Sequence, residues 1–161
     1  MTALQMFQWI ERTNVGTSIR ESNYAFVIIV GMHALGLAAS VGIVLWFDLR
    51  LLGWTMREQR VSEVYRSLAP WMLGGFAIMF ATGLLLFWAQ AGRCYQNGYC
   101  HTKIPLLLVP AINALIYHRM TKRGISKWDA DPVPPPAARI AGAVSILSWA
   151  TIIVLGRQIG F

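Results

Sequence analysis

Four long apolar stretches, separated by shorter polar segments, dominate the hydropathy pattern of the chain. The clearest stretch, from Tyr24 to Phe47, has no Lys, Arg, Asp or Glu in 24 residues. As a helix rising about 1.5 Å per residue it covers roughly 36 Å, enough to cross a hydrocarbon core of about 30 Å. The pattern predicts four transmembrane helices, over residues 19–52, 70–91, 103–123 and 137–158.

Local signals predict where these helices begin and end. Ser18-Ile-Arg-Glu21 has the form of a capping box, which predicts that the first span starts near Ile19. Pro70 marks either a kink or the true start of the second span. Ahead of the first span, residues 4–10 alternate apolar and polar side chains over too short a length to span, which predicts a helix lying in the membrane interface.

The composition supports a membrane protein. Hydrophobic residues make up 56% of the 161 residues and charged residues 13%, whereas an ordinary soluble domain has about 25% charged residues. This length accommodates four spans with short connections and no separate soluble domain. We therefore expect a single all-α domain over residues 1–161, an integral membrane four-helix bundle with a short N-terminal interfacial helix.

The net charge of +7 is concentrated in the loops on one side of the predicted membrane. The positive-inside rule accounts for this asymmetry, so a nucleic-acid partner is not indicated. The side of the first and third loops carries nine basic residues: Arg50, Arg57, Arg60, Arg66, Arg119, Lys122, Arg123, Lys127 and Arg139. The other side carries five: Arg12, Arg20, Arg93, Lys103 and Arg157. We therefore predict a multi-pass protein of a bacterial inner membrane with both termini in the periplasm.

The two cysteines lie in the loop that this topology places outside. Cys94 and Cys100 flank an Asn97-Gly98 turn signal, and the oxidising periplasm favours a disulfide between them. A metal site formed by both cysteines with His101 is the alternative, although it offers only three ligands. The five residues between the cysteines do not match the two of a c-type haem attachment motif.

His33, well inside the first span, is the main candidate for a cofactor ligand. An ionisable side chain within the hydrocarbon region is costly and is usually retained for a partner or a function. Gly36 and Ser40 share its helix face, so the sequence predicts room there for the macrocycle of haem b, with the imidazole as axial ligand. Alternatively, the imidazole forms a hydrogen bond to a neighbouring helix.

His118 is the candidate for a second iron ligand. It lies near the basic end of the third span, whereas His33 lies roughly 21 Å inside the corresponding end of the first span. The two histidines share one iron only if the third helix is displaced; otherwise His118 is a histidine of the membrane boundary. Arg50 and Arg157 are candidates to bind haem propionates or a quinone headgroup, or else they extend to the membrane surface. Lys103 and Asn113 are secondary candidates for the same role.

Several short motifs carry a resemblance to known membrane proteins. They are Ile19-Arg-Glu21, His33-Ala-Leu-Gly-Leu-Ala38, Asp48-Leu-Arg-Leu-Leu-Gly53, Lys103 with Asn113-Ala114, and Trp149 with Gly156-Arg157. Together they resemble a family of small four-span bacterial membrane proteins without a settled function. More distantly, the chain is similar to the cytochrome b561 and copper-resistance D type four-helix membrane proteins. That similarity implies haem b and quinone-linked electron transfer. With three histidines, however, one copy cannot provide the two histidine pairs of the b561 pattern.

These observations lead to two expectations for function. The first is a membrane haem b subunit, an oxidoreductase subunit if it is part of an enzyme, that transfers electrons between quinone and a periplasmic partner. The second is a non-redox protein, either a structural subunit of a larger membrane complex or a small transporter. Small residues suit association with other subunits or with a second copy; they are Gly75 and Gly83 in the second span, and Gly156 and Gly160 in the fourth.

Overall fold

The computed structural model describes residues 2–159, without the side chains of residues 120–123 and 159. Within this range every regular element is a helix. The elements are α1 (Ala3–Glu11), α2 (Asn14–Glu21), α3 (Ala25–Leu51), α4 (Val61–Ala89), α5 (Ala91–Gln96), α6 (Gly98–Leu106), α7 (Leu108–Gly124), the 3₁₀ turn η1 (Ile125–Lys127) and α8 (Pro136–Ile159). Four helical stretches are long and apolar enough to cross a membrane: Ala25–Leu51, Val61–Ala89, Gly98–Arg119 and Pro136–Gln158. The predicted all-α membrane bundle is therefore confirmed.

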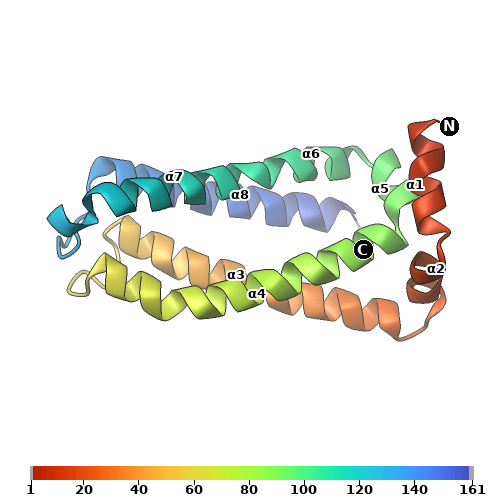
Figure 1. The fold of residues 1–161 in the computed structure, drawn as a ribbon, viewed down its shortest axis with the longest axis horizontal. Helices are drawn as coiled ribbons and strands as arrows, with labels where there is room; N and C mark the ends of the chain where they lie inside the picture. The colour runs from red at the N-terminus through yellow and green to blue at the C-terminus, as the bar shows by residue number, and fades with distance from the viewer. Residues whose placement is uncertain (1, 160–161) are drawn as a thin grey trace.

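The long helices lie side by side, and α1 and α2 cross one end of them (Figure 1). The most extensive contact joins α3 to α4; α8 packs on α3, and α6 and α7 pack on α8. The last turns of α8 return to the end that carries α1 and α2, here called the α1–α2 end (Figure 1). Large apolar side chains such as Leu35, Phe80 and Leu147 are exposed along the spans, as expected for surfaces that contact lipid.

The first span begins later than the sequence predicts. Thr13 accepts a hydrogen bond from the backbone of Gly16 and caps α2, which ends at Glu21. The predicted capping box therefore lies within α2. The spanning helix α3 begins at Ala25, whose backbone N–H donates to the hydroxyl of Ser22 at 3.1 Å. The predicted start near Ile19 is wrong because the backbone is extended at Ser22, which ends α2 and separates it from the spanning helix.

The second and third spans differ from the prediction at their prolines. Helix α4 runs without interruption from Val61 through Pro70 and includes the residues before the predicted start. The third span, in contrast, consists of two helices, α6 and α7, with a break at Leu107. Pro110 has no N–H to donate to the carbonyl of Leu106, which accounts for a break at this level.

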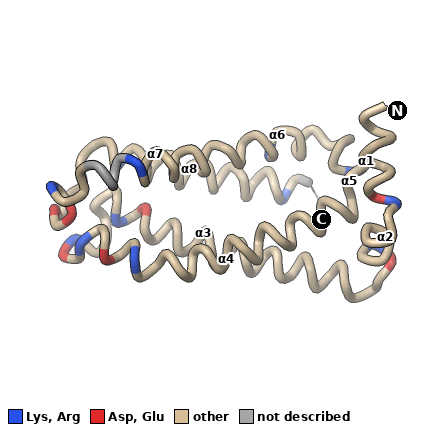
Figure 2. Tube along the Cα trace, viewed as in Figure 1, with Lys and Arg blue, Asp and Glu red and all other residues tan. Residues whose placement is uncertain are grey.

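Charged residues gather at the two ends of the bundle and leave the long helices between them almost uncharged (Figure 2). At the end opposite α1 and α2, two loops are joined by hydrogen bonds. The carboxylate of Asp129 accepts from the backbone and the hydroxyl of Ser62, at 2.8 and 2.6 Å, and so caps the start of α4. This tie fixes the α3–α4 loop against the segment that precedes α8.

Candidate functional site

The closest contact in the bundle is the seam between α3 and α4, and it is formed by small residues. A Cβ atom on Gly75 would lie 2.9 Å from the backbone nitrogen of Ser40. A Cβ atom on Gly36 would lie 3.1 Å from the backbone nitrogen of Met79. The space that these residues leave beside His33 is therefore occupied by the backbone of α4. A large flat ligand of His33 has to lie away from Gly36 and Ser40.

His33 is half-buried on α3, and its ring is held by α4. Its Nδ1 lies 3.0 Å from the carbonyl oxygen of Met79 and 3.0 Å from the hydroxyl of Thr82. The Thr82 hydroxyl donates to the carbonyl of Ile78 at 2.6 Å. Because a carbonyl only accepts, the short contact to Met79 places the proton on Nδ1. Nε2 then carries the lone pair that can bind a metal ion or accept a proton.

Gly83 lets the imidazole lie close to the backbone of α4. A Cβ atom at this position would be 3.1 Å from Cε1 of His33. The ring is therefore fixed by a hydrogen bond at Nδ1 and by the close approach of its edge to a glycine. These restraints set the orientation of Nε2 before any ligand binds, as a hydrogen bond at the other ring nitrogen does for metal-binding histidines.

Lys103 brings a positive charge from α6 to the same part of the bundle. Its side chain is half-buried, and its Nζ lies 3.4 Å from the place that a Cβ atom of Gly156 on α8 would occupy. It is close enough to His33 to act on the imidazole electrostatically. Residues from α3, α4, α6 and α8 thus meet in the half of the bundle nearest α1 and α2.

His118 lies far from this group. It is exposed on α7, one residue before the third span ends at Arg119. Along helices that rise about 1.5 Å per residue, His33 is about 12 Å from the α1–α2 end and His118 is about 30 Å from it. The two imidazoles are separated by much of the membrane thickness, so a single iron within one copy cannot bind both.

The family of the chain follows from a comparison with protein-family models. A model described as a family of unknown function, DUF6644, matches residues 6–161. The chain belongs to the DUF6644 family. No curated protein and no solved structure matches it. The resemblance to a small membrane family without a settled function is thus confirmed, and the comparisons give no link to cytochrome b561.

In the DUF6644 chain, Arg50 is enclosed by loops. The side chain is fully buried; Nε and Nη2 donate to the carbonyl of Gln59 at 3.1 and 2.9 Å, and Nη2 also donates to the carbonyl of Asp131 at 3.0 Å. Arg50 therefore joins the two loops at the end opposite α1 and α2 and is not accessible to a quinone headgroup or a propionate.

Arg157 is exposed at the α1–α2 end. Asn113 instead joins α7 to α8, donating to the carbonyl of Ala141 at 2.9 Å.

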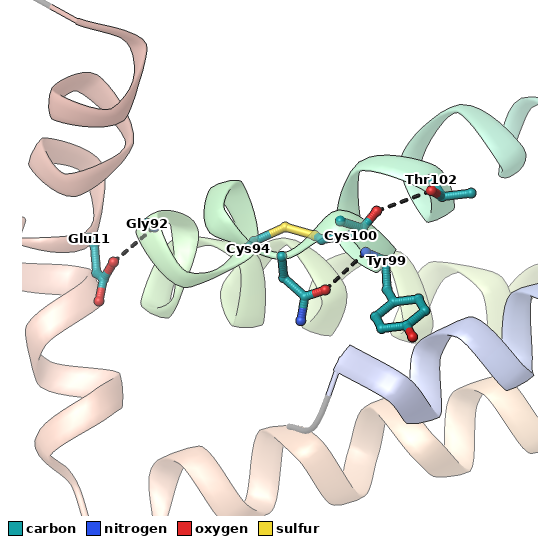
Figure 3. The surroundings of a disulfide bond; sticks show 8 residues. Glu11, Gly92, Cys94, Tyr99, Cys100 and Thr102 are labelled. Carbon is teal, nitrogen blue, oxygen red and sulfur yellow. Dashed lines mark hydrogen bonds between the residues drawn. A yellow bond between two sulfur atoms is a disulfide. The ribbon is translucent and has the colours of Figure 1, made fainter.

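The cysteines of the DUF6644 chain form a disulfide that joins α5 to α6 (Figure 3). Beside it, the carboxylate of Glu11 accepts from the backbone of Gly92 at 2.9 Å and pairs with Arg20 at 3.2 Å, which fixes α1 and α2 to this corner. Because both sulfur atoms are bonded to each other, they are not available to a metal ion. Among the described residues, no three His, Cys, Asp or Glu side chains are grouped as a metal site would require.

Proposed function

We propose that this DUF6644 protein is a membrane subunit that binds haem b through His33 and takes part in quinone-linked electron transfer with a periplasmic partner. The observation that carries the proposal is the hydrogen bond between Nδ1 of His33 and the carbonyl of Met79, within a membrane span. Axial histidines of haem proteins need a neutral imidazole with Nε2 unprotonated, and a backbone carbonyl at Nδ1 favours that tautomer.

The residues around His33 fit haem b as an axial ligand on one side, and they restrict the position that the haem would take. Haem would supply one-electron redox chemistry, and the chain would supply its axial nitrogen, orientation and surroundings. Met79 and Thr82 hold the imidazole, while the closed seam at Gly36 directs a ligand to another side of the ring. Because His118 lies at the other end of the bundle, we propose that one copy supplies one axial ligand.

The proposed orientation of the protein in the membrane determines which aqueous partner can exchange electrons with a haem at His33. Nine basic residues on the side of the first and third loops and five on the other support, by the positive-inside rule, an orientation with the α1–α2 end in the periplasm. His33 then lies in the periplasmic half of a bacterial inner membrane. This depth is consistent with exchange with a periplasmic partner.

A second candidate is a non-redox structural subunit, and the α3–α4 seam favours it. The same hydrogen bonds that orient His33 also satisfy its polar nitrogen against α4, and the small residues around it allow two backbones to touch. In that case the histidine is a polar contact between helices, and it strengthens packing without binding a ligand.

Absorbance spectroscopy distinguishes the two functions. Protein purified from haem-replete cells should give a Soret band and a positive pyridine haemochrome assay, and His33→Ala should abolish both or convert the spectrum to a high-spin form. His101→Ala is the matched control, since that ring is exposed and lies beside Tyr95 at the α1–α2 end. A haem-free wild type, or a spectrum unchanged by His33→Ala, would establish the structural subunit instead.

A further inference from the structure

The electron-transfer proposal does not explain why the charged residue Lys103 lies within a membrane span. It belongs to the third membrane-spanning stretch, Gly98–Arg119, and its ammonium lies against the backbone of α8 at Gly156, where no side chain intervenes. It also acts electrostatically on His33 of α3. The ammonium is therefore directed between helices, toward the interior of the bundle.

Among the described residues, no carboxylate pairs with this ammonium. In the part of the chain that the structure describes, the Lys103 side chain forms no hydrogen bond and no ion pair. An uncompensated charge at this depth is costly, and lysines retained within spans usually face a partner or a pathway.

We propose that Lys103 and Gly156 form an intramembrane anion site, which binds the carboxylate or phosphate group of a ligand that reaches it through the bilayer. An anion satisfies the ammonium in a way that a neutral carbonyl does not, because it supplies both a charge and hydrogen-bond acceptors. Gly156 is the other half of the site, because a Cβ atom there would already touch the ammonium at 3.4 Å, and a branched side chain would compete with it for space.

Two sources can supply the anion. One is a propionate of the haem proposed at His33, which rests on the proposed function, since Lys103 and His33 are close without sharing a hydrogen bond. The other is the phosphate of an anionic lipid, since the Lys103 Cα lies only about 8 Å along α6 from the end of the third span. The chemistry at Lys103 is the same for both, and the sources are separable by experiment.

The first experiment tests the propionate. Haem-free protein in nanodiscs of neutral lipid is titrated with haem b and with its dimethyl ester, which lacks the two carboxylates. The wild type should bind haem b at least tenfold more tightly than the ester, and Lys103→Met should remove that preference while still binding both. Lys127→Met is the matched control, because Lys127 is exposed at the opposite end of the bundle, and it should retain the preference.

The second experiment tests the lipid. Protein is transferred into nanodiscs of phosphatidylcholine with or without phosphatidylglycerol, and retained lipid is measured by native mass spectrometry. The wild type and Lys127→Met should retain phosphatidylglycerol, whereas Lys103→Met should not. Gly156→Val keeps the Lys103 charge but puts a branched side chain where the ammonium lies. It should therefore lose the same binding that Lys103→Met loses, in whichever experiment the wild type binds. It also replaces Lys103→Met as the test variant if Lys103→Met does not fold.

The outcomes separate this site from the proposed function. If the wild type binds no form of haem, the haem proposal fails, and lipid retention alone decides the role of Lys103. If haem b and its ester bind equally and no phosphatidylglycerol is retained, the anion site is refuted while haem binding at His33 stands. Equal behaviour of the wild type, Lys103→Met and Gly156→Val in both experiments would refute it as well.

Discussion

At the level of single residues, Arg50 shows how a buried charge is accommodated by backbone carbonyls, since no described carboxylate forms an ion pair with it. Its guanidinium donates to the backbone carbonyls of Gln59 and Asp131, which belong to different loops. The planar guanidinium suits this task, since it presents several N–H groups in a fixed geometry. Lys103 has no comparable set of acceptors, which is why the two buried cations have different expected roles.

Replacing Arg50 by Met should destabilise the fold without affecting any ligand. The substitution removes the hydrogen bonds that join the carbonyls of Gln59 and Asp131, so the free energy of unfolding should fall by about 3 kcal/mol, in line with lost hydrogen bonds to a charged group. Thermal unfolding in mild detergent measures the loss. Arg139→Met is the control, since Arg139 is exposed at the same end of the bundle; equal midpoints for the two variants would contradict the role assigned to Arg50.

The sequence predicts which residue is unusual at the candidate site, but it does not predict the contacts of that residue. An imidazole within an uncharged stretch identifies His33 as unusual, but its acceptor, Met79, is a backbone carbonyl 46 residues away. Which carbonyl it meets depends on how α3 and α4 are aligned, and no periodicity in the sequence specifies that alignment. The same reasoning applies to Arg50, because loop carbonyls have no signature in the side chains.

At the level of helices, the contact between α3 and α4 depends on which face each glycine occupies. Gly74 and Gly75 are adjacent on α4, yet a Cβ atom on Gly74 would meet nothing within 4 Å, whereas one on Gly75 would lie 2.9 Å from the backbone of Ser40. Gly75→Ala should therefore push the helices apart and lower the free energy of unfolding by about 2 kcal/mol.

Gly74→Ala is the matched control for that seam. It adds the same methyl group one residue away, on an open face, so it should leave stability unchanged or raise it by about 0.5–1 kcal/mol through helix propensity. Thermal unfolding of both variants in the same detergent makes the comparison. If the two substitutions shift the midpoint equally, the close contact at Gly75 does not contribute to stability.

The helix boundaries also show what the sequence can predict. Long, mainly apolar stretches identify all four spans, because length and a low content of charged residues suffice. The starts are harder, because Thr13, Ser18 and Ser22 are all plausible caps, and packing of α2 against α4 decides among them. Two prolines with the same local chemistry behave differently: α4 continues through Pro70, while the third span breaks just before Pro110.

At the level of the whole molecule, the two ends of the bundle differ in construction. One end is closed by α1 and α2, which are tied to α5 through Glu11 and Gly92, and a disulfide joins α5 to α6. The other end consists of two loops fastened by Arg50 and Asp129. His33 and Lys103 lie nearer the first end. The side of the membrane that this end faces therefore decides which aqueous partner the site can exchange with.

Single introduced cysteines can determine that side. In a background with Cys94→Ser and Cys100→Ser, Gln96→Cys reports the α1–α2 end and Ser126→Cys the opposite loop, and both positions are exposed. Because basic residues favour the cytoplasm, a membrane-impermeant maleimide should label Gln96→Cys in spheroplasts and Ser126→Cys only after lysis. The cysteine-free parent should stay unlabelled. The reverse pattern would place His33 and Lys103 in the cytoplasmic half of the membrane and exclude a periplasmic redox partner for this site.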